Sequence, residues 1–167
     1  MATEVKPNRE VKPIPDGYHT LTPYLYVRDG VKALEFYKQA FGAQEMFRMA
    51  AQGGKIGHAE IKIGDSIVML ADEMKEWGNR SPQTLGGNGS SLAMYVNDVD
   101  AAFKRAVDAG AQIKRPLANQ FYGDRTGTIE DPFGHVWTIA THVEDVSPEE
   151  IERRGKTEME KMPTTQT

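Results

Sequence analysis

The sequence predicts an α+β fold in which one βαβββ unit occurs twice and a C-terminal helix follows. Strand-like segments with alternating apolar residues and a segment with helical spacing follow one another in the same order in both halves. Gly42 and Gly110 occupy equivalent places, where each predicted helix ends. One such sheet cannot cover both of its faces, so two units are stabilised by pairing. We therefore expect two tandem modules that form a cupped mixed sheet.

Changes in composition along the chain predict where each module begins and ends. The first residues are polar and contain Pro7, Pro13 and Pro15, which favour an extended arm over a helix. The stretch before the second module is irregular and ends in a glycine-rich run at 86–89. The predicted parts are an extended leader (1–18), a first βαβββ module (19–72), a linker or lid (73–89), a second βαβββ module (90–143), and a C-terminal helix and tail (144–167).

The first module begins with a strand, Leu21–Val27, in which alternate apolar side chains share one face. An amphipathic helix over 31–43 follows and ends at Gly42. Three further β segments span 44–50, 56–64 and 66–72. The turns between them contain glycine, as β-hairpins require.

The second module repeats this order. A strand at 90–96 precedes a helix at 98–111, and a weaker β segment follows at Gln112–Lys114. After a turn-rich stretch, two more strands are predicted at 125–131 and 135–143.

The last segment predicts a terminal helix. Ser147 and Glu150 form a capping box, with Pro148 at the first helical position, so the helix extends to about Lys161. Its apolar residues are sparse, which is typical of a surface helix or one that braces a dimer.

Composition limits the possible functions. The chain has 167 residues, 39% hydrophobic and 26% charged, with no apolar run long enough to span a bilayer, which is typical of a soluble globular protein without a membrane partner. No signal peptide is recognisable, so a cytoplasmic location is expected. The absence of cysteine excludes disulfides and thiolate-bound metals. A net charge of -4 argues against nucleic-acid binding.

Three segments carry a resemblance to a known family. VKPIPDGYHTLTPYLYVRD, GHAEIKIGDSIVML and GDRTGTIEDPFGHVWTIATHVEDVSPEEI resemble the vicinal-oxygen-chelate superfamily, in its glyoxalase/bleomycin-resistance group and PhnB-like branch. The similarity covers about Gly17–Arg154, and DPFGHVW is its most specific part. It implies a glyoxalase/bleomycin-resistance fold whose concave face holds a ligand, often with a divalent metal and often in a homodimer.

The resemblance also implies metal ligands at four strand positions, two histidines and two glutamates. In this sequence those positions hold Thr22, Met69, Ser91 and Thr138. Hydroxyl and thioether groups are poor ligands for the metals concerned. We therefore expect no cofactor at the family's metal site, and the alternative is a divalent metal bound by another set such as His58 and Glu60.

Strand alternation predicts which side chains face the cup, because successive residues point to opposite faces of a sheet. On the segment 56–64, for example, His58, Glu60 and Lys62 face the cup, and the residues between them face the helix. Aromatic residues in nearby loops add further candidates. The predicted ligand-binding residues are Tyr24, Tyr26, His58, Glu60, Met69, Trp77, Tyr95, Phe121, Tyr122, Arg125, Glu130 and Thr138.

Several of these residues allow a second interpretation. His58 and Glu60 share a face and form either an acid/base or metal pair, or a polar pair that fixes strand register. Arg125 either holds an anionic ligand or forms a surface ion pair. Trp77 packs either as a lid over the cup or against a partner subunit.

Three functions compete. The first is a homodimer that binds a small, aromatic or planar molecule in its cup without a metal. The second is a metal-dependent lyase, isomerase or dioxygenase of the same superfamily that uses a different ligand set. The third is a structural or regulatory homodimer whose cup is vestigial. No catalytic residue is assigned.

Overall fold

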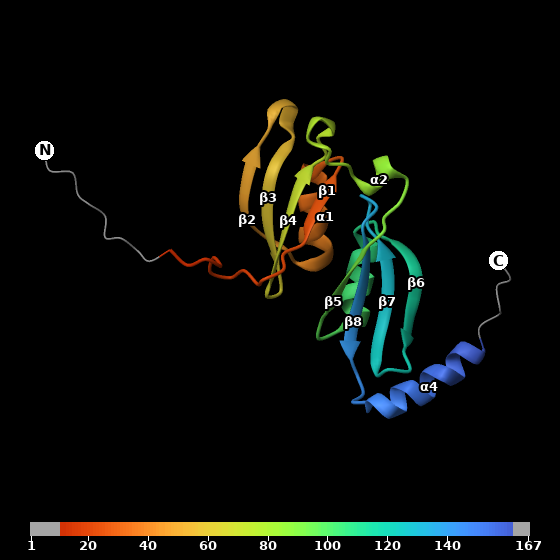
Figure 1. Cartoon of the computed structure of the whole chain (residues 1–167). Helices are drawn as coiled ribbons and strands as arrows, with labels where there is room; N and C mark the ends of the chain where they lie inside the picture. The colour runs from red at the N-terminus through yellow and green to blue at the C-terminus, as the bar shows by residue number, and fades with distance from the viewer. Residues whose placement is uncertain (1–10, 162–167) are drawn as a thin grey trace, which may run out of the picture.

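The computed structural model describes residues 11–161, in which the elements follow the predicted order (Figure 1). The first module contains β1 (Tyr24–Val27), α1 (Gly30–Phe41), β2 (Gln44–Ala50), β3 (Ile56–Ile63) and β4 (Ser66–Asp72). The second module contains β5 (Ser91–Tyr95), α3 (Val99–Asp108), β6 (Gln112–Asn119), β7 (Asp124–Glu130) and β8 (Val136–His142), and α4 (Pro148–Glu160) follows it. The α+β class, both modules and the C-terminal helix are confirmed. Residues 1–10 of the predicted leader and 162–167 of the predicted tail lie outside the described residues.

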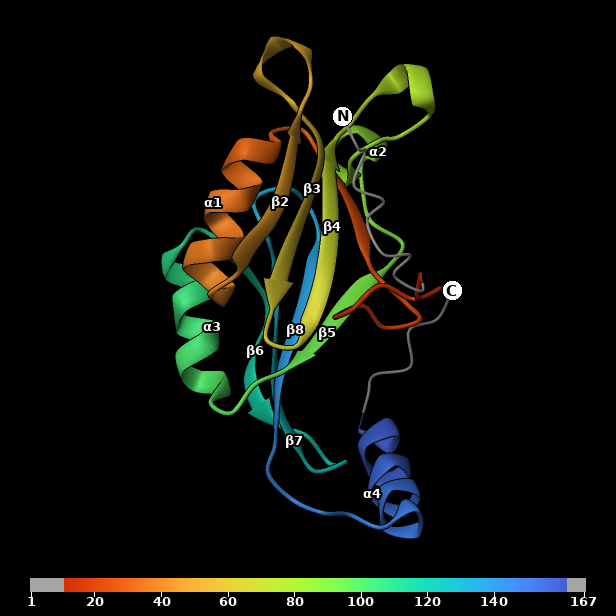
Figure 2. The same ribbon diagram turned by 90° about the vertical axis from the view of Figure 1, so that its left-hand side faces the viewer.

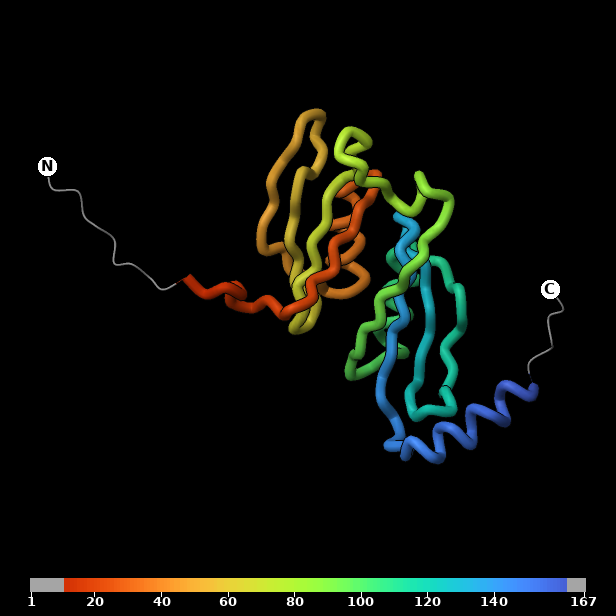
Figure 3. The backbone as a smooth tube through the Cα atoms, viewed as in Figure 1, coloured from red at the N-terminus to blue at the C-terminus, as the bar shows by residue number. Residues whose placement is uncertain are grey.

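Each module forms its own four-stranded mixed sheet, in the orders β1-β4-β3-β2 and β5-β8-β7-β6. β1 is parallel to β4 and β5 is parallel to β8, and the other neighbours are antiparallel. Within residues 11–161 no strand pairing joins the two sheets, which form separate groups of strands in Figure 3. The predicted cup surface is therefore divided between two sheets of the single chain.

Two strands differ from the prediction by three or more residues at one end, and both differences involve proline. β1 begins at Tyr24 rather than Leu21, because Pro23 has no N–H with which to extend the ladder. β6 continues to Asn119 through Pro116, within a stretch predicted to be turns. The strand tolerates this proline because β6 is an edge strand whose pairing with β7 is irregular there.

Capping residues define both long helices of the modules. Asp29 accepts a hydrogen bond from the Lys32 amide at the start of α1, and Asp98 accepts one from the Ala101 amide at the start of α3. α1 ends at Gly42, whose φ of +66° is left-handed. α3 ends at Asp108, two residues before Gly110, whose φ is +114°. A glycine of positive φ thus follows both helices, directly at the cap in α1 and one residue beyond the cap in α3.

Glu73 anchors the linker between the modules. It accepts hydrogen bonds from the Ser81 amide, the Ser81 hydroxyl and the Thr84 hydroxyl at 2.8–2.9 Å, and Arg28 Nε lies 3.5 Å away. Burial opposes ionisation, but these hydrogen bonds outweigh it and lower the pKa of Glu73 to about 2. The carboxylate thus fixes the start of the short helix α2 (Pro82–Leu85).

α1 and α3 pack against each other, and the two modules share one hydrophobic core. Aromatic rings from both modules meet in it. Phe41 lies 4.8 Å from Trp137 between ring centroids, Tyr37 lies 5.7 Å from Trp137, and Phe36 lies 6.2 Å from Phe133. These distances are in the range of favourable tilted and edge-to-face contacts. The aromatic contacts hold the helix side of one module against the other.

Asp131 connects the two modules through hydrogen bonds. Its Oδ2 accepts from the Tyr37 hydroxyl at 2.7 Å and from Trp137 Nε1 at 2.9 Å. Its Oδ1 accepts from the amides of Phe133 and His135 at 2.9 and 3.0 Å. A carboxylate that is only 3% exposed is tolerated because donors occupy both of its oxygens.

The helices cover one face of each sheet and leave the opposite face open. Figure 2 shows α1 and α3 on one side of the strands, with residues 11–23 and α4 on the other. The first open face, opposite α1, carries Tyr24, Tyr26, His58, Glu60, Lys62, Ile67 and Met69. The second open face, opposite α3, carries Ala93, Tyr95, Asp124, Thr126, Thr128, Glu130, Val136, Thr138 and His142. Residues between them, such as Leu25, Ile61 and Ile139, are buried under the helices, which confirms the predicted alternation.

α4 rests on the loop between β6 and β7. Its start is capped by Ser147, which accepts from the Glu150 amide. Arg154 Nη1 donates to the carbonyl of Phe121 at 3.3 Å, and the Phe121 ring lies against Gly155. With 13 residues, α4 is the longest described helix, and none of the helices within 11–161 is long and apolar enough to cross a membrane.

We predict that Tyr37→Phe lowers the free energy of unfolding by about 1 to 3 kcal/mol, because it leaves a lone pair of buried Asp131 without its donor. Denaturant unfolding measures the loss. Tyr122→Phe is the matched control, since Tyr122 is 36% exposed, and its effect should stay within about 0.5 kcal/mol. Equal stability of the two variants would contradict the role assigned to Asp131.

Candidate functional site

Tyr24, His58 and Glu60 form a hydrogen-bonded chain on the first open face. The Tyr24 hydroxyl lies 2.8 Å from His58 Nδ1, and His58 Nε2 lies 3.3 Å from Glu60 Oε1. Strand register explains the arrangement, because Tyr24 pairs with Met69 on β4, and Met69 pairs with Glu60 on β3. The structure thus brings together four of the residues predicted for the cup.

Tyr18, in the segment that precedes β1, lies close to Glu60 at the end of this hydrogen-bonded chain. Burial raises the pKa of Tyr18 to about 12, aided by a hydrogen bond to Glu60 and by the negative charge of that carboxylate. The segment also covers part of the sheet, since Ile67 on the first open face is only 4% exposed and lies close to Gly17. Sequence reasoning missed Tyr18, because no periodicity in the leader connects it to β3.

Aromatic rings surround the polar chain. The rings of Tyr24 and Tyr26 lie 5.1 Å apart, and the His58 ring lies 5.5 Å from Tyr24 and 6.2 Å from Phe47. Tyr24 is 41% exposed and Phe47 50% exposed. Phe47, on the edge strand β2 opposite Glu60, was not predicted. The first open face therefore combines accessible ring surface with polar groups, as small-molecule sites do.

A second series of hydrogen-bonded side chains lies on the second open face. The Tyr95 hydroxyl donates to Asp124 Oδ2 at 2.6 Å, and Asp124 Oδ1 lies 2.7 Å from His142 Nδ1. His142 Nε2 lies 2.9 Å from Asp145 Oδ1. Only Tyr95 was predicted. Asp124 and His142 could also have been predicted. Alternate residues on a strand share a face, so Asp124 shares the face of Thr126 on β7, and His142 shares the face of Thr138 on β8.

The hydrogen-bonded side chains on the second open face shift one another's pKa values. Burial opposes ionisation of Asp124, but hydrogen bonds from Tyr95 and His142 outweigh it, so its pKa is lowered. The hydrogen bond to Asp124, followed by that to Asp145, raises the pKa of His142. The bond to Asp124 also raises the pKa of Tyr95. His142 therefore gains a proton more readily in the folded chain than in the unfolded chain.

Three further predicted residues lie on or beside the second open face. The Thr138 hydroxyl lies 3.2 Å from the Thr128 hydroxyl, and Glu130 pairs with Lys114 at 2.9 Å. Tyr122 is partly exposed at the end of the sheet, in edge-to-face contact with Phe121 at 5.2 Å.

Three predicted residues lie away from both open faces. Phe121 packs under α4 against Gly155. Arg125 follows Asp124 in the strand and so points to the opposite face, where it donates to both carboxylate oxygens of Asp100 at 2.7 and 2.8 Å. Trp77 is 69% exposed in the linker, so within this chain it covers no cup.

The positions that the family uses for metal ligands do not provide suitable donors here. Thr22 precedes β1, Ser91 opens β5, Met69 packs beside Tyr24, and Thr138 bonds to Thr128. A thioether and three hydroxyls do not fit a nickel, zinc, iron or manganese site. Nor do the described residues contain any group of three histidines and carboxylates placed to hold a metal, so no third ligand accompanies His58 and Glu60.

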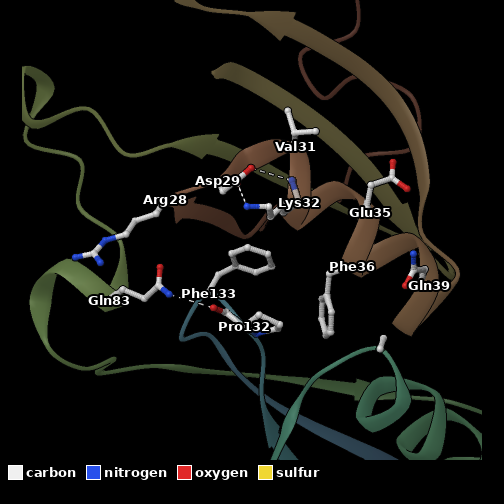
Figure 4. Close-up of a pocket in the computed structure, with 11 residues that line it drawn as sticks. Arg28, Asp29, Val31, Lys32, Glu35, Phe36, Gln39, Gln83, Pro132 and Phe133 are labelled. Atoms are coloured by element: carbon white, nitrogen blue, oxygen red, sulfur yellow. Dashed lines mark hydrogen bonds and ion pairs between the residues drawn. The ribbon is translucent and has the colours of Figure 1, made fainter. Parts of the chain in front are cut away.

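Cavities lie along the seam between the modules. A cavity of about 720 Å³ is lined by His19, residues 21–23, residues 63–68 around the turn between β3 and β4, and residues 92–97. A second, of about 530 Å³, opens on the helix side between α1 and the turn at Pro132 and Phe133 (Figure 4). The charged groups there are already paired, Lys32 with Asp29 and Arg28 with Glu73. This second cavity is therefore a poor site for a charged ligand.

His135 joins the modules at this seam. Its Nε2 lies 3.0 Å from the carbonyl oxygen of Tyr26, which can only accept, so the ring donates. Burial of the ring (8% exposed) supports a structural role.

Comparisons with known proteins agree with this architecture. A family model described as the Glyoxalase/Bleomycin resistance protein/Dioxygenase superfamily matches residues 18–139. The Mycobacterium bovis protein Mb0911c is 41% identical over 135 residues, covering 79% of this chain and 89% of that protein. The structure of TioX from Micromonospora sp. ML1 is 29% identical with a TM-score of 0.58, covering 74% of this chain and 98% of TioX. The Arabidopsis thaliana protein At5g48480 is 28% identical with a TM-score of 0.60, over the same shares of the two chains.

We predict that His142 makes the stability of the protein depend on pH. Folding raises the pKa of His142, so the protonated ring stabilises the folded chain. This stabilisation is complete below the unfolded pKa of 6.5 and is lost as the pH rises through the folded pKa. The melting-temperature difference between the wild type and His142→Gln should therefore shrink from pH 6 to pH 8.5. Asp145→Asn should show part of the same effect. A difference that is constant over this range would contradict the assignment.

Proposed function

Because the chain belongs to the Glyoxalase/Bleomycin resistance protein/Dioxygenase superfamily, we propose that it binds a small, aromatic or planar molecule on its open sheet faces. We further propose that a second copy of the chain completes the cup, and that binding needs no metal at the family's positions. The PhnB-like branch is the part of the superfamily to which we assign it, on the segments between Gly17 and Arg154.

The observation that carries this proposal is the contrast between the two faces of each sheet. The helix side is a continuous core, whereas the open faces expose Tyr24 and Tyr95 beside organised polar groups. Exposed aromatic and polar side chains held in fixed positions favour ligand recognition over simple packing.

Exposed apolar residues support a second copy. On the edge strand β2, Met46, Phe47 and Met49 are each about half exposed, at 50%, 50% and 51%. Edge strands with exposed apolar side chains tend to be covered by another chain. A partner placed over these residues would also enclose the first open face, which they border.

The donor chemistry supports independence from metal. Thr22, Met69, Ser91 and Thr138 lack the basicity and charge to displace water from a divalent metal. A metal-dependent enzyme that uses His58 and Glu60 is the less favoured alternative, because Glu60 and the Tyr24 hydroxyl already occupy both ring nitrogens of His58.

We predict a dimer in solution. Light scattering at micromolar concentration should give about twice the chain mass of 18.6 kDa. Phe47→Asp should shift the mass toward one chain, because it places a charge on the apolar edge. A single-chain mass for the wild type would contradict the proposed shared cup.

We predict that 2-naphthol, a neutral planar probe, binds with the same affinity before and after treatment with a chelator. Tyr24→Ala should weaken binding about three- to tenfold in calorimetric titration, because one ring contact is lost. Leu85→Ala is the control, since this side chain is 64% exposed in the short helix α2 and belongs to neither sheet. Loss of binding on chelation would favour the metal-dependent alternative.

A further inference from the structure

We infer that the ligand of the first open face carries a protonated amine beside its aromatic or planar body, a conclusion that rests on the proposed function and specifies the chemical class of the ligand.

The directions of the hydrogen bonds determine which atoms remain free. An ionised Glu60 carboxylate only accepts, so the His58 Nε2 that faces it at 3.3 Å carries the ring proton. His58 Nδ1 is then a lone pair and accepts from the Tyr24 hydroxyl at 2.8 Å. The Tyr24 oxygen keeps a free lone pair, and Glu60 keeps further accepting capacity. The chain of groups therefore offers acceptors to a ligand that must donate.

The Glu60 carboxylate has no cationic side chain bonded to it among the described residues. Its bonded partner is His58 at 3.3 Å, with Tyr18 close by, and within residues 11–161 no lysine or arginine forms an ion pair with it. The side chains of Glu60 and His58 are each only 21% exposed. Hydrogen bonds to a charged group in such partly buried surroundings are about twice as strong as neutral ones. An ammonium group would supply both the missing positive charge and the donors.

The rings around Glu60 favour the same class of ligand. Tyr24 and Tyr26 lie 5.1 Å apart, and Phe47 is opposite Glu60 in the strand register. Aromatic faces attract cations through their quadrupole and also stack on planar groups. A ligand with an amine next to an aromatic body therefore satisfies the carboxylate and the rings together.

Lys62 supplies the opposing charge that makes the inference testable. It is on the same open face, two residues from Glu60 along β3, at roughly 6.6 Å along the strand. A cationic ligand held by Glu60 is repelled by Lys62, whereas an anionic ligand is attracted. Removal of each charge should therefore change affinity in opposite directions.

The experiment uses the full chain and three probes with the same ring: 2-phenylethylamine, 2-phenylethanol and 3-phenylpropionate. Calorimetric titration at pH 7.5 and low salt should rank the amine tightest. Glu60→Gln should weaken the amine about tenfold and change the alcohol by less than about twofold, because only the charge-assisted contact is lost. Lys62→Gln should tighten the amine about twofold.

Each other outcome has a defined meaning. If the alcohol or the carboxylate binds at least as tightly as the amine, the amine inference is overturned while the proposed function stands. If none of the probes binds saturably, both are overturned. Should Glu60→Gln fail to fold, Lys62→Gln still decides, because weaker binding of the amine to that variant would contradict the inference.

Discussion

A buried carboxylate, Asp131, holds the two modules together, and the placement of both open faces depends on it. One of its oxygens binds Tyr37 of α1 and Trp137 of β8, and the other binds two amides of its own turn. Every lone pair that is turned toward the core is thus used, which compensates for removing the charge from water. The aromatic rings around it then bring α1 and α3 together. With the helices on the inside of the molecule, both sheets must present their other faces to the outside.

The two open faces use the same groups in a different order. On the first face an imidazole lies between a hydroxyl and a carboxylate, in the order Tyr24, His58, Glu60. On the second face a carboxylate lies between a hydroxyl and an imidazole, in the order Tyr95, Asp124, His142. The first arrangement leaves the carboxylate free to accept from a ligand. The second uses both oxygens of the carboxylate within the chain, so it serves to fix Tyr95 and to respond to pH.

Segments outside the modules complete each face. The stretch before β1 brings Tyr18 to Glu60 and covers Ile67, and α4 covers Phe121 beside the second sheet. Glu73 holds the linker through its hydrogen bonds to Ser81 and Thr84, and Trp77 of the linker is exposed. The leader and the terminal helix therefore shape the surroundings of the faces, while the positions of Tyr24 and Tyr95 follow from their strands.

The sequence by itself determined the order of elements, the helix ends and the assignment of side chains to faces, because these follow from periods of two and 3.6 residues and from local capping. His58, Glu60 and Met69 could therefore be placed on one face in advance. Only the tertiary structure decided that Tyr18 lies close to Glu60 and that Arg125 binds Asp100 rather than a ligand. It also decided that the sheets stay separate within one chain. These outcomes depend on contacts between residues far apart in the sequence, whose geometry is set by tertiary packing and leaves no local periodicity to detect.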